Sequence, residues 1–143
     1  MEKTLKEIDD EYSTQAQTEA FFADAQGYIK VLEKHLERPS RFDTKLLHNI
    51  SNMCFEKLLV SLLSNYNIEA LNHTPMALFI EASKTDTGLT ESMRSTAKNL
   101  QRHESICSLD DRGYSVPDET QLREIIIGLI EIRDFVQARI HSD

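Results

Sequence analysis

The stretch that decides the fold is Ser40–Tyr66, SRFDTKLLHNISNMCFEKLLVSLLSNY. Its apolar residues recur every three or four positions, the pattern of a helix with one buried face. They are Leu46, Leu47, Ile50, Met53, Cys54, Leu58, Leu62 and Leu63. Ser40 followed by Asp43 matches a capping box, and no Pro or Gly interrupts the pattern that follows. A helix of this length extends roughly 37 Å, so other helices must cover its apolar stripe.

A second long helix is predicted before this stretch, over residues 14–37. Thr14 with Gln17 matches a capping box, and the segment ends before Pro39 because a residue that precedes proline disfavours the α conformation. Its apolar positions are Ala20, Phe21, Ala25, Tyr28, Ile29, Leu32 and Leu36. Since only two or three residues separate the two long helices, we expect them to pack antiparallel.

Three more helices are expected further along the chain, over about 74–83, 90–105 and 118–140. Each begins with a capping residue, and Asp118 with Gln121 gives the last one a capping box. The segment IIIGLIEI in the last helix could by itself be a buried strand, but the long stretch without Pro favours a helix.

The composition agrees with an all-helical protein. The chain has 4 Gly and 3 Pro in 143 residues, far fewer turn-forming residues than a many-stranded sheet needs. We therefore predict an all-α, up-and-down helical bundle of four to five helices. Residues 14–141 form a single domain, and residues 1–13 are a polar lead-in.

Charge and cysteine content restrict the classes of partner and compartment. With 24 acidic and 16 basic residues the net charge is −8, the wrong sign for extended binding to DNA. Cys54 and Cys107 lack any CxxC or Cys/His spacing, which favours a reduced pair over a disulfide. The N-terminal residues are charged, and the longest apolar run is too short to span a bilayer. We expect a soluble, cytoplasmic protein with no membrane partner.

The sequence lacks the motifs that organise common enzyme sites. Its five histidines include no HExxH motif, and no His or Cys pair has i, i+4 spacing on a predicted helix, so we predict no metal. It has no Walker or Rossmann glycine-rich loop and no nucleophile elbow, so we predict no cofactor.

Three segments carry a resemblance to a known family. They are Phe55–Leu59 (FEKLL) within the central helix, His73–Leu78 (HTPMAL) at the start of the short helix, and Arg112–Pro117 (RGYSVP) before the last helix. In this order, over roughly residues 14–140, the chain resembles the HEPN family of small all-α proteins. The resemblance implies one of three roles: an RNA-cleaving toxin, a substrate-binding partner of a minimal nucleotidyltransferase, or a degenerate binding module.

The resemblance also implies where catalytic residues would lie. HEPN ribonucleases carry an Arg and a His that are separated by four to six intervening residues, near their later helices. In this chain that spacing occurs at Arg41 and His48, which lie instead at the start of the central helix. A metal-independent, toxin-like endoribonuclease that uses these two residues is the alternative hypothesis. The simpler interpretation is a surface arginine and a helix-face histidine.

The main hypothesis is a non-catalytic HEPN-like binding module with a basic site on its later helices. The candidate binding residues are Arg94, Lys98, Arg102, His103, Arg112 and Tyr114. The first three are spaced i, i+4, i+8 and must share one helix face. Their ligand would be a nucleotide, an RNA end or a partner protein, although a solvated helix face explains the same spacing.

The last helix also suggests self-association. Ile127, Ile130 and Phe135 widen its apolar stripe beyond what one bundle needs to bury, which predicts a homodimer through the C-terminal helix. An interaction protein without a small ligand is therefore a third hypothesis. The family resemblance implies a nucleotidyltransferase-type protein as a further partner.

Overall fold

The computed structural model describes residues 5–104 and 116–141, and all regular structure in these two ranges is helical. The helices are α1 (Leu5–Glu37), α2 (Thr44–Asn65), α3 (Pro75–Thr85), α4 (Glu91–Glu104) and α5 (Glu119–Ile140). The predicted all-α bundle is confirmed. The segment IIIGLIEI lies within α5 and is helical.

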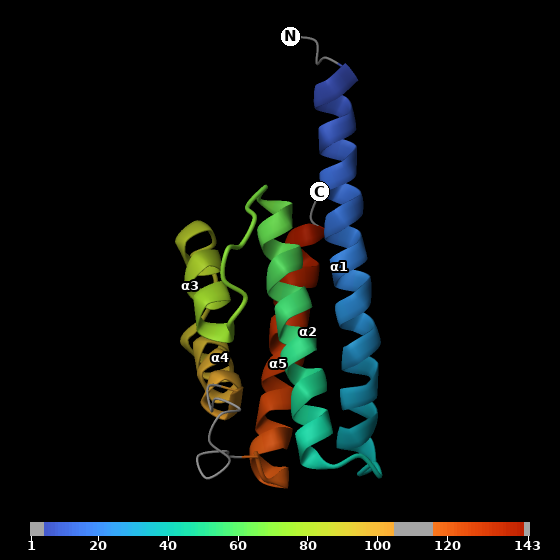
Figure 1. Cartoon of the computed structure of the whole chain (residues 1–143), viewed down its shortest axis with the longest axis vertical. Helices are drawn as coiled ribbons and strands as arrows, with labels where there is room; N and C mark the ends of the chain where they lie inside the picture. Colours follow the sequence, from blue (N-terminus) through green and yellow to red (C-terminus); the bar gives the residue numbers. More distant parts are fainter. Residues whose placement is uncertain (1–4, 105–115, 142–143) are drawn as a thin grey trace.

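The second helix, α2, is the centre of the bundle and contacts each of the other four helices. The long helix α1 lies on one side of it and the shorter α3 and α4 on the other, while α5 packs against α1, α2 and α4 (Figure 1). As predicted, α1 and α2 are antiparallel neighbours joined by a short connection. The stretch quoted first is therefore the scaffold of the protein.

The core consists of the helix faces that meet around α2. Its most buried large side chains include Ile29, Leu32, Leu47, Phe55, Leu58, Leu62, Leu78, Leu100, Leu122 and Ile125. At the edges of the predicted stripes four expectations are wrong. Ala20 in α1 is exposed. In α1 the core residue is Phe22, and Phe21 is only half-buried. In α2, Leu46 and Met53 are exposed, because the apolar stripe is wider than the surface that the neighbouring helices cover.

Two helix starts differ from the sequence prediction. Helix α1 begins at Leu5, so the capping pattern at Thr14 lies inside a continuous helix. No Pro or Gly precedes Thr14 to interrupt the helix, and its carbonyl accepts a hydrogen bond from the Thr18 hydroxyl. Helix α2 begins at Thr44, and its N-cap is Asp43, whose carboxylate accepts a hydrogen bond from the backbone N–H of Leu46 at 2.8 Å.

Ser40 does not cap α2 because it contacts His35, a buried residue in the last turn of α1. The backbone N–H of Ser40 donates to Nδ1 of His35 at 3.0 Å, so a neutral ring carries its proton on Nε2. That nitrogen donates to Oε1 of Glu119, 2.7 Å away in the first turn of α5. The capping box of Asp118 and Gln121, which was predicted, is confirmed. These contacts fix the start of α5 against the α1–α2 connection.

Close packing of α4 on α5 depends on Gly128. A Cβ atom added at this glycine would overlap the hydroxyl of Thr96 in α4 and lie 3.0 Å from its Cβ and Cγ2 atoms. Gly27 in α1 is different, because a Cβ there would have no neighbour within 4 Å. Only the first glycine is required by packing.

We expect Gly128→Ala to lower the free energy of unfolding by about 1–2 kcal/mol, because overpacking outweighs the gain in helix propensity. Gly27→Ala, the matched control, should raise it by up to about 1 kcal/mol. Urea unfolding measures both, and Thr96→Ala should recover part of the Gly128→Ala loss. Equal effects of the two glycine substitutions would show that Thr96 yields without cost.

Candidate functional site

Three of the predicted binding residues form a basic row along α4. Arg94, Lys98 and Arg102 follow one another on one side of the helix, and the last two are exposed. Nε of Arg94 lies 3.6 Å from Oε2 of Glu91, and its guanidinium lies 5.3 Å from the centre of the Phe79 ring. Arg94 is therefore held against the bundle, and Lys98 and Arg102 are its exposed continuation. We call these three residues the α4 basic row.

His103 does not join this row. It is adjacent to Arg102 in sequence, but the helix turns it into the core, where it is 4% exposed. Its ring packs edge-on against that of His48 in α2, with 5.4 Å between the ring centres. Arg112 and Tyr114, the other two predicted members, lie outside the described residues. The structure thus brings together three of the six predicted binding residues.

The two residues of the ribonuclease hypothesis lie in different environments. Arg41 is exposed in the connection before α2, whereas His48 is only 3% exposed. Burial, and then the neighbouring His103, lower the pKa of His48 to about 4. A neutral imidazole so well shielded from solvent is poorly placed to act on RNA. The geometry does not favour catalysis by this pair.

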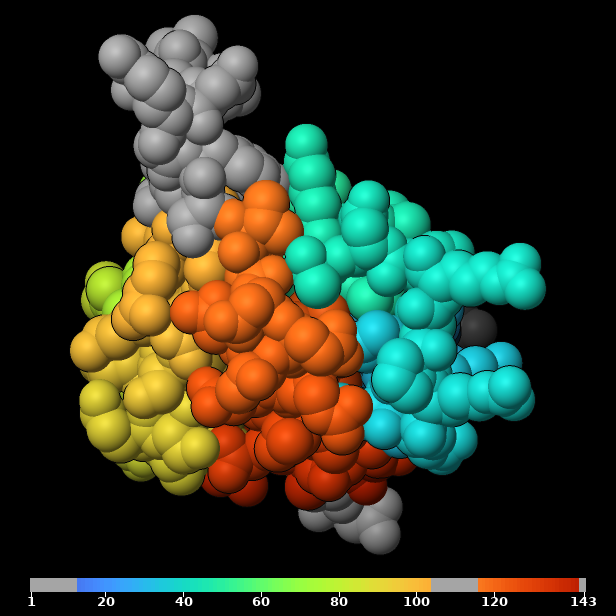
Figure 2. All heavy atoms as spheres, turned by 90° about the horizontal axis from the view of Figure 1, so that it is seen from below, coloured from blue at the N-terminus to red at the C-terminus, as the bar shows by residue number. Residues whose placement is uncertain are grey.

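A groove between α4 and α5 borders the basic row. Small polar residues of α4 line one side, namely Ser92, Ser95, Thr96 and Asn99. Ile127 of α5, which is 58% exposed, lies on the other side between Glu124 and Glu131. Figure 2 shows the two helices side by side at the surface, with α1 and α2 beyond α5. One face of the protein therefore carries a basic ridge, a groove and an acidic ridge.

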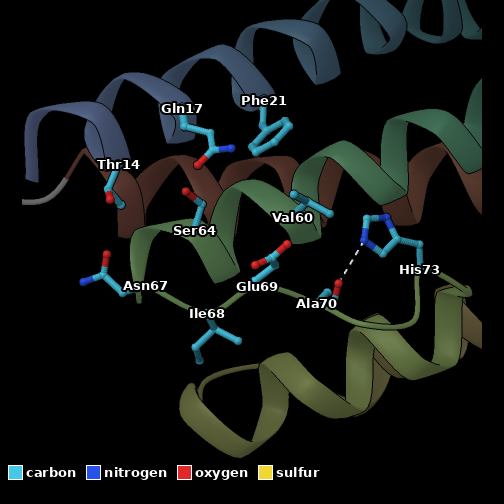
Figure 3. A pocket seen from close by; sticks show the side chains of 10 residues that line it. All are labelled: Thr14, Gln17, Phe21, Val60, Ser64, Asn67, Ile68, Glu69, Ala70 and His73. Carbon is cyan, nitrogen blue, oxygen red and sulfur yellow. Dashed lines mark hydrogen bonds between the residues drawn. The ribbon is translucent and has the colours of Figure 1, made fainter. Parts of the chain in front are cut away.

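A second candidate site was not predicted from the sequence. A cavity of about 390 Å³ lies between α1, the C-terminal half of α2 and the α2–α3 connection (Figure 3). Its lining residues are Thr14, Gln17, Phe21, Val60, Ser64, Asn67, Ile68, Glu69, Ala70 and His73. They come from three segments whose approach depends on the tertiary fold, so no local motif indicates the cavity.

His73 forms one wall of this cavity and is fixed in place. Its Nδ1 atom lies 2.9 Å from Oε1 of Glu56 in α2, and its Nε2 atom lies 3.2 Å from the carbonyl oxygen of Ala70. Glu56 and His73 belong to two of the segments on which the HEPN hypothesis rests, and the fold brings them into contact.

The described part of the chain contains one cysteine. Cys54 is a free, buried thiol, and burial raises its pKa to about 12, so it is a poor nucleophile. Cys107 lies outside the described residues. Among residues 5–104 and 116–141, no group of three or more His, Cys, Asp or Glu side chains is arranged to hold a metal ion.

In the same ranges, no helix combines the length and apolarity that a transmembrane span requires.

No protein-family model matches the sequence, and no curated protein or solved structure is detectably similar to it. The resemblance to the HEPN family therefore rests on the segments quoted above and stays a hypothesis.

Proposed function

We propose that this protein is a non-catalytic, HEPN-like interaction module that works as a homodimer, with the groove between α4 and α5 at the dimer interface. The observation that carries the proposal is the order of features on this face. Exposed Ile127 lies between Glu124 and Glu131, and the α4 basic row lies across the groove from them. One face therefore carries both a positive and a negative ridge, and each ridge is complementary in charge to the other ridge of a second copy.

A two-fold symmetric interface needs a surface that is complementary to itself. An axis that runs along the groove, parallel to the helices, places the basic ridge of each copy over the acidic ridge of the other. Thr96 contacts the backbone at Gly128, and the two helices run in opposite directions (Figure 1). Lys98 and Glu124 are therefore displaced in the same direction along the groove from the Thr96–Gly128 contact. In the dimer, Lys98 of one copy faces Glu124 of the other.

The exposed apolar side chain supplies the second part of the argument. Ile127 of each copy lies next to the axis and would enter the groove lined by the small side chains of α4. Burial of an isoleucine side chain stabilises an interface by about 1.5–3 kcal/mol. The charged ridges fix the orientation of the two copies more than the affinity.

Sedimentation velocity tests the proposal. We expect a dimer at micromolar concentration and a monomer for Ile127→Lys, while Ile80→Lys, at an apolar α3 residue that is 45% exposed, should leave the dimer intact. Lys98→Glu and Glu124→Lys should each weaken the dimer, and the double variant should restore it, because the facing Lys98–Glu124 pair then exchanges its charges. A wild-type monomer at high micromolar concentration would exclude the proposal.

A nucleotide or RNA end would need the same cations, so the test separates these ligands from self-association. If the wild type remains monomeric but binds short RNA or nucleotides in calorimetric titrations, and Arg102→Glu abolishes that binding, the basic row is a phosphate site instead. RNA cleavage that His48→Ala abolishes would support the endoribonuclease alternative.

A further inference from the structure

We infer that the cavity between α1, α2 and the α2–α3 connection binds a small organic cation, an ammonium or guanidinium group on a short aliphatic stem. The cavity is formed by Thr14, Gln17 and Phe21 of α1, Val60 and Ser64 of α2, and the connection from Asn67 to His73. Its volume of about 390 Å³ lies within the range of ligand sites.

The charge on the cavity wall selects against anions. Figure 3 shows the Glu69 carboxylate directed back toward α1, where the Gln17 side chain points toward the connection. Glu69 is exposed and forms no ion pair within the part of the chain that the structure describes. The whole protein carries a net charge of −8. An unpaired carboxylate beside amide and hydroxyl groups offers acceptors that match the N–H donors of a cation.

The nearby basic side chain does not neutralise this wall. Nζ of Lys57 lies 3.7 Å from Oδ2 of Asp24 and 5.2 Å from the centre of the Phe21 ring. Its charge is therefore matched by Asp24, outside the cavity. His73 has Oε1 of Glu56 and the Ala70 carbonyl oxygen beside its two nitrogens. A neutral ring donates to only one of these acceptors, and a protonated ring would have its charge matched by the Glu56 carboxylate.

Apolar groups account for the rest of the lining. Phe21, Val60 and Ala70 border the cavity, while Ile68 is directed toward α3 in Figure 3. A ring, a branched side chain and a methyl group bury methylene groups well, and an aromatic ring close to a cation adds attraction. The two kinds of lining together fit an amphipathic cation rather than a hydrated metal ion.

Calorimetric titration with four probes that share a four-carbon chain tests the inference. Butylammonium and butylguanidinium should bind saturably, with dissociation constants on the order of 1 mM for ligands of this size. Butyramide should bind at least tenfold more weakly, and butyrate should not bind. The tripeptide acetyl-Gly-Arg-Gly-amide distinguishes a free cation from a partner's side chain, since tighter binding of the peptide than of butylguanidinium indicates a protein source.

Two charge-matched variants make the test specific. Glu69→Gln should weaken binding of both cations at least tenfold. Glu37→Gln removes the same charge at an exposed residue in the last turn of α1 and should change the affinity less than twofold. Equal binding of butyramide and the cations, equal effects of the two variants, or no saturable binding of either cation would overturn the inference. The cavity shares no lining residue with the α4–α5 face. A failure of the dimer experiment would therefore leave the inference about the cavity untouched, and the reverse also holds.

Discussion

Replacing Asp86 with alanine should lower the free energy of unfolding by about 2–4 kcal/mol, because several hydrogen bonds converge on this one buried carboxylate. Asp86 follows α3 and is 6% exposed. Its Oδ2 atom accepts hydrogen bonds from the Tyr66 hydroxyl at 2.6 Å and from Nε of Arg139 at 2.8 Å. Its Oδ1 atom accepts one from the backbone N–H of Gly88 at 2.9 Å. The carboxylate therefore joins the C-terminal ends of α2, α3 and α5.

The pKa of Asp86 indicates that the folded state favours the ionised form. Burial alone would raise this pKa, but the hydrogen bonds from Arg139, Tyr66 and Gly88 outweigh burial, and the net shift is downward from 3.8. A lowered folded-state pKa means that the stabilisation is present above pH 3.8 and is lost as the pH falls through the lowered value.

Asp24→Ala is the matched control for Asp86→Ala. Asp24 also pairs with a basic residue, Lys57 at 3.7 Å, but its side chain is 57% exposed, so its loss should cost less than about 1 kcal/mol. Denaturant unfolding of both variants gives the comparison. Tyr66→Phe should lower stability by about 1 kcal/mol and have less effect when Asp86 is already alanine. Equal losses for the two aspartate variants would contradict a central role for Asp86.

The helices could be predicted because their signals are local. Periodic apolar residues and capping residues lie within a few positions of one another, and Asp118 with Gln121 acts as the sequence indicates. The two misplaced helix starts have non-local or contextual causes. Ser40 contacts His35 in the preceding helix, and Thr14 follows residues that already continue the helix. A capping pattern starts a helix only where the preceding chain does not extend it.

The candidate sites were less predictable because they depend on contacts between distant segments. The spacing of the α4 basic row predicted one shared helix face, on which Lys98 and Arg102 are exposed. The same sequence could not show that His103 packs on His48, 55 residues earlier in the chain. The cavity at His73 combines residues of α1, α2 and a connection. Its polar residues belong to no local sequence motif, and they lie close together only in the folded chain.

Lowering the pH from 7 to 4 should remove about 3 kcal/mol of stability through His48 alone. Its pKa is about 4 in the folded protein, against 6.5 for an unperturbed histidine, and each pKa unit corresponds to about 1.4 kcal/mol. Between these two values the unfolded chain binds more protons than the folded protein, so stability falls as the pH falls. The structural cause is burial beside the imidazole of His103, at 5.4 Å between ring centres.

The hydrogen bonding of His48 gives this prediction a specific test. Nε2 lies 3.2 Å from Nδ2 of Asn52, so a neutral ring accepts there, and its Nδ1 atom has no partner among the described residues. Protonation would put a second donor beside the Asn52 amide and a charge into the core.

His48→Gln should flatten the pH dependence of the unfolding free energy between pH 6.5 and 4. His141→Gln, at a half-exposed histidine paired with Glu19, should keep the wild-type slope. Because the contribution of Asp86 falls only below pH 3.8, a slope confined to lower pH would assign the acid sensitivity to that carboxylate instead of His48.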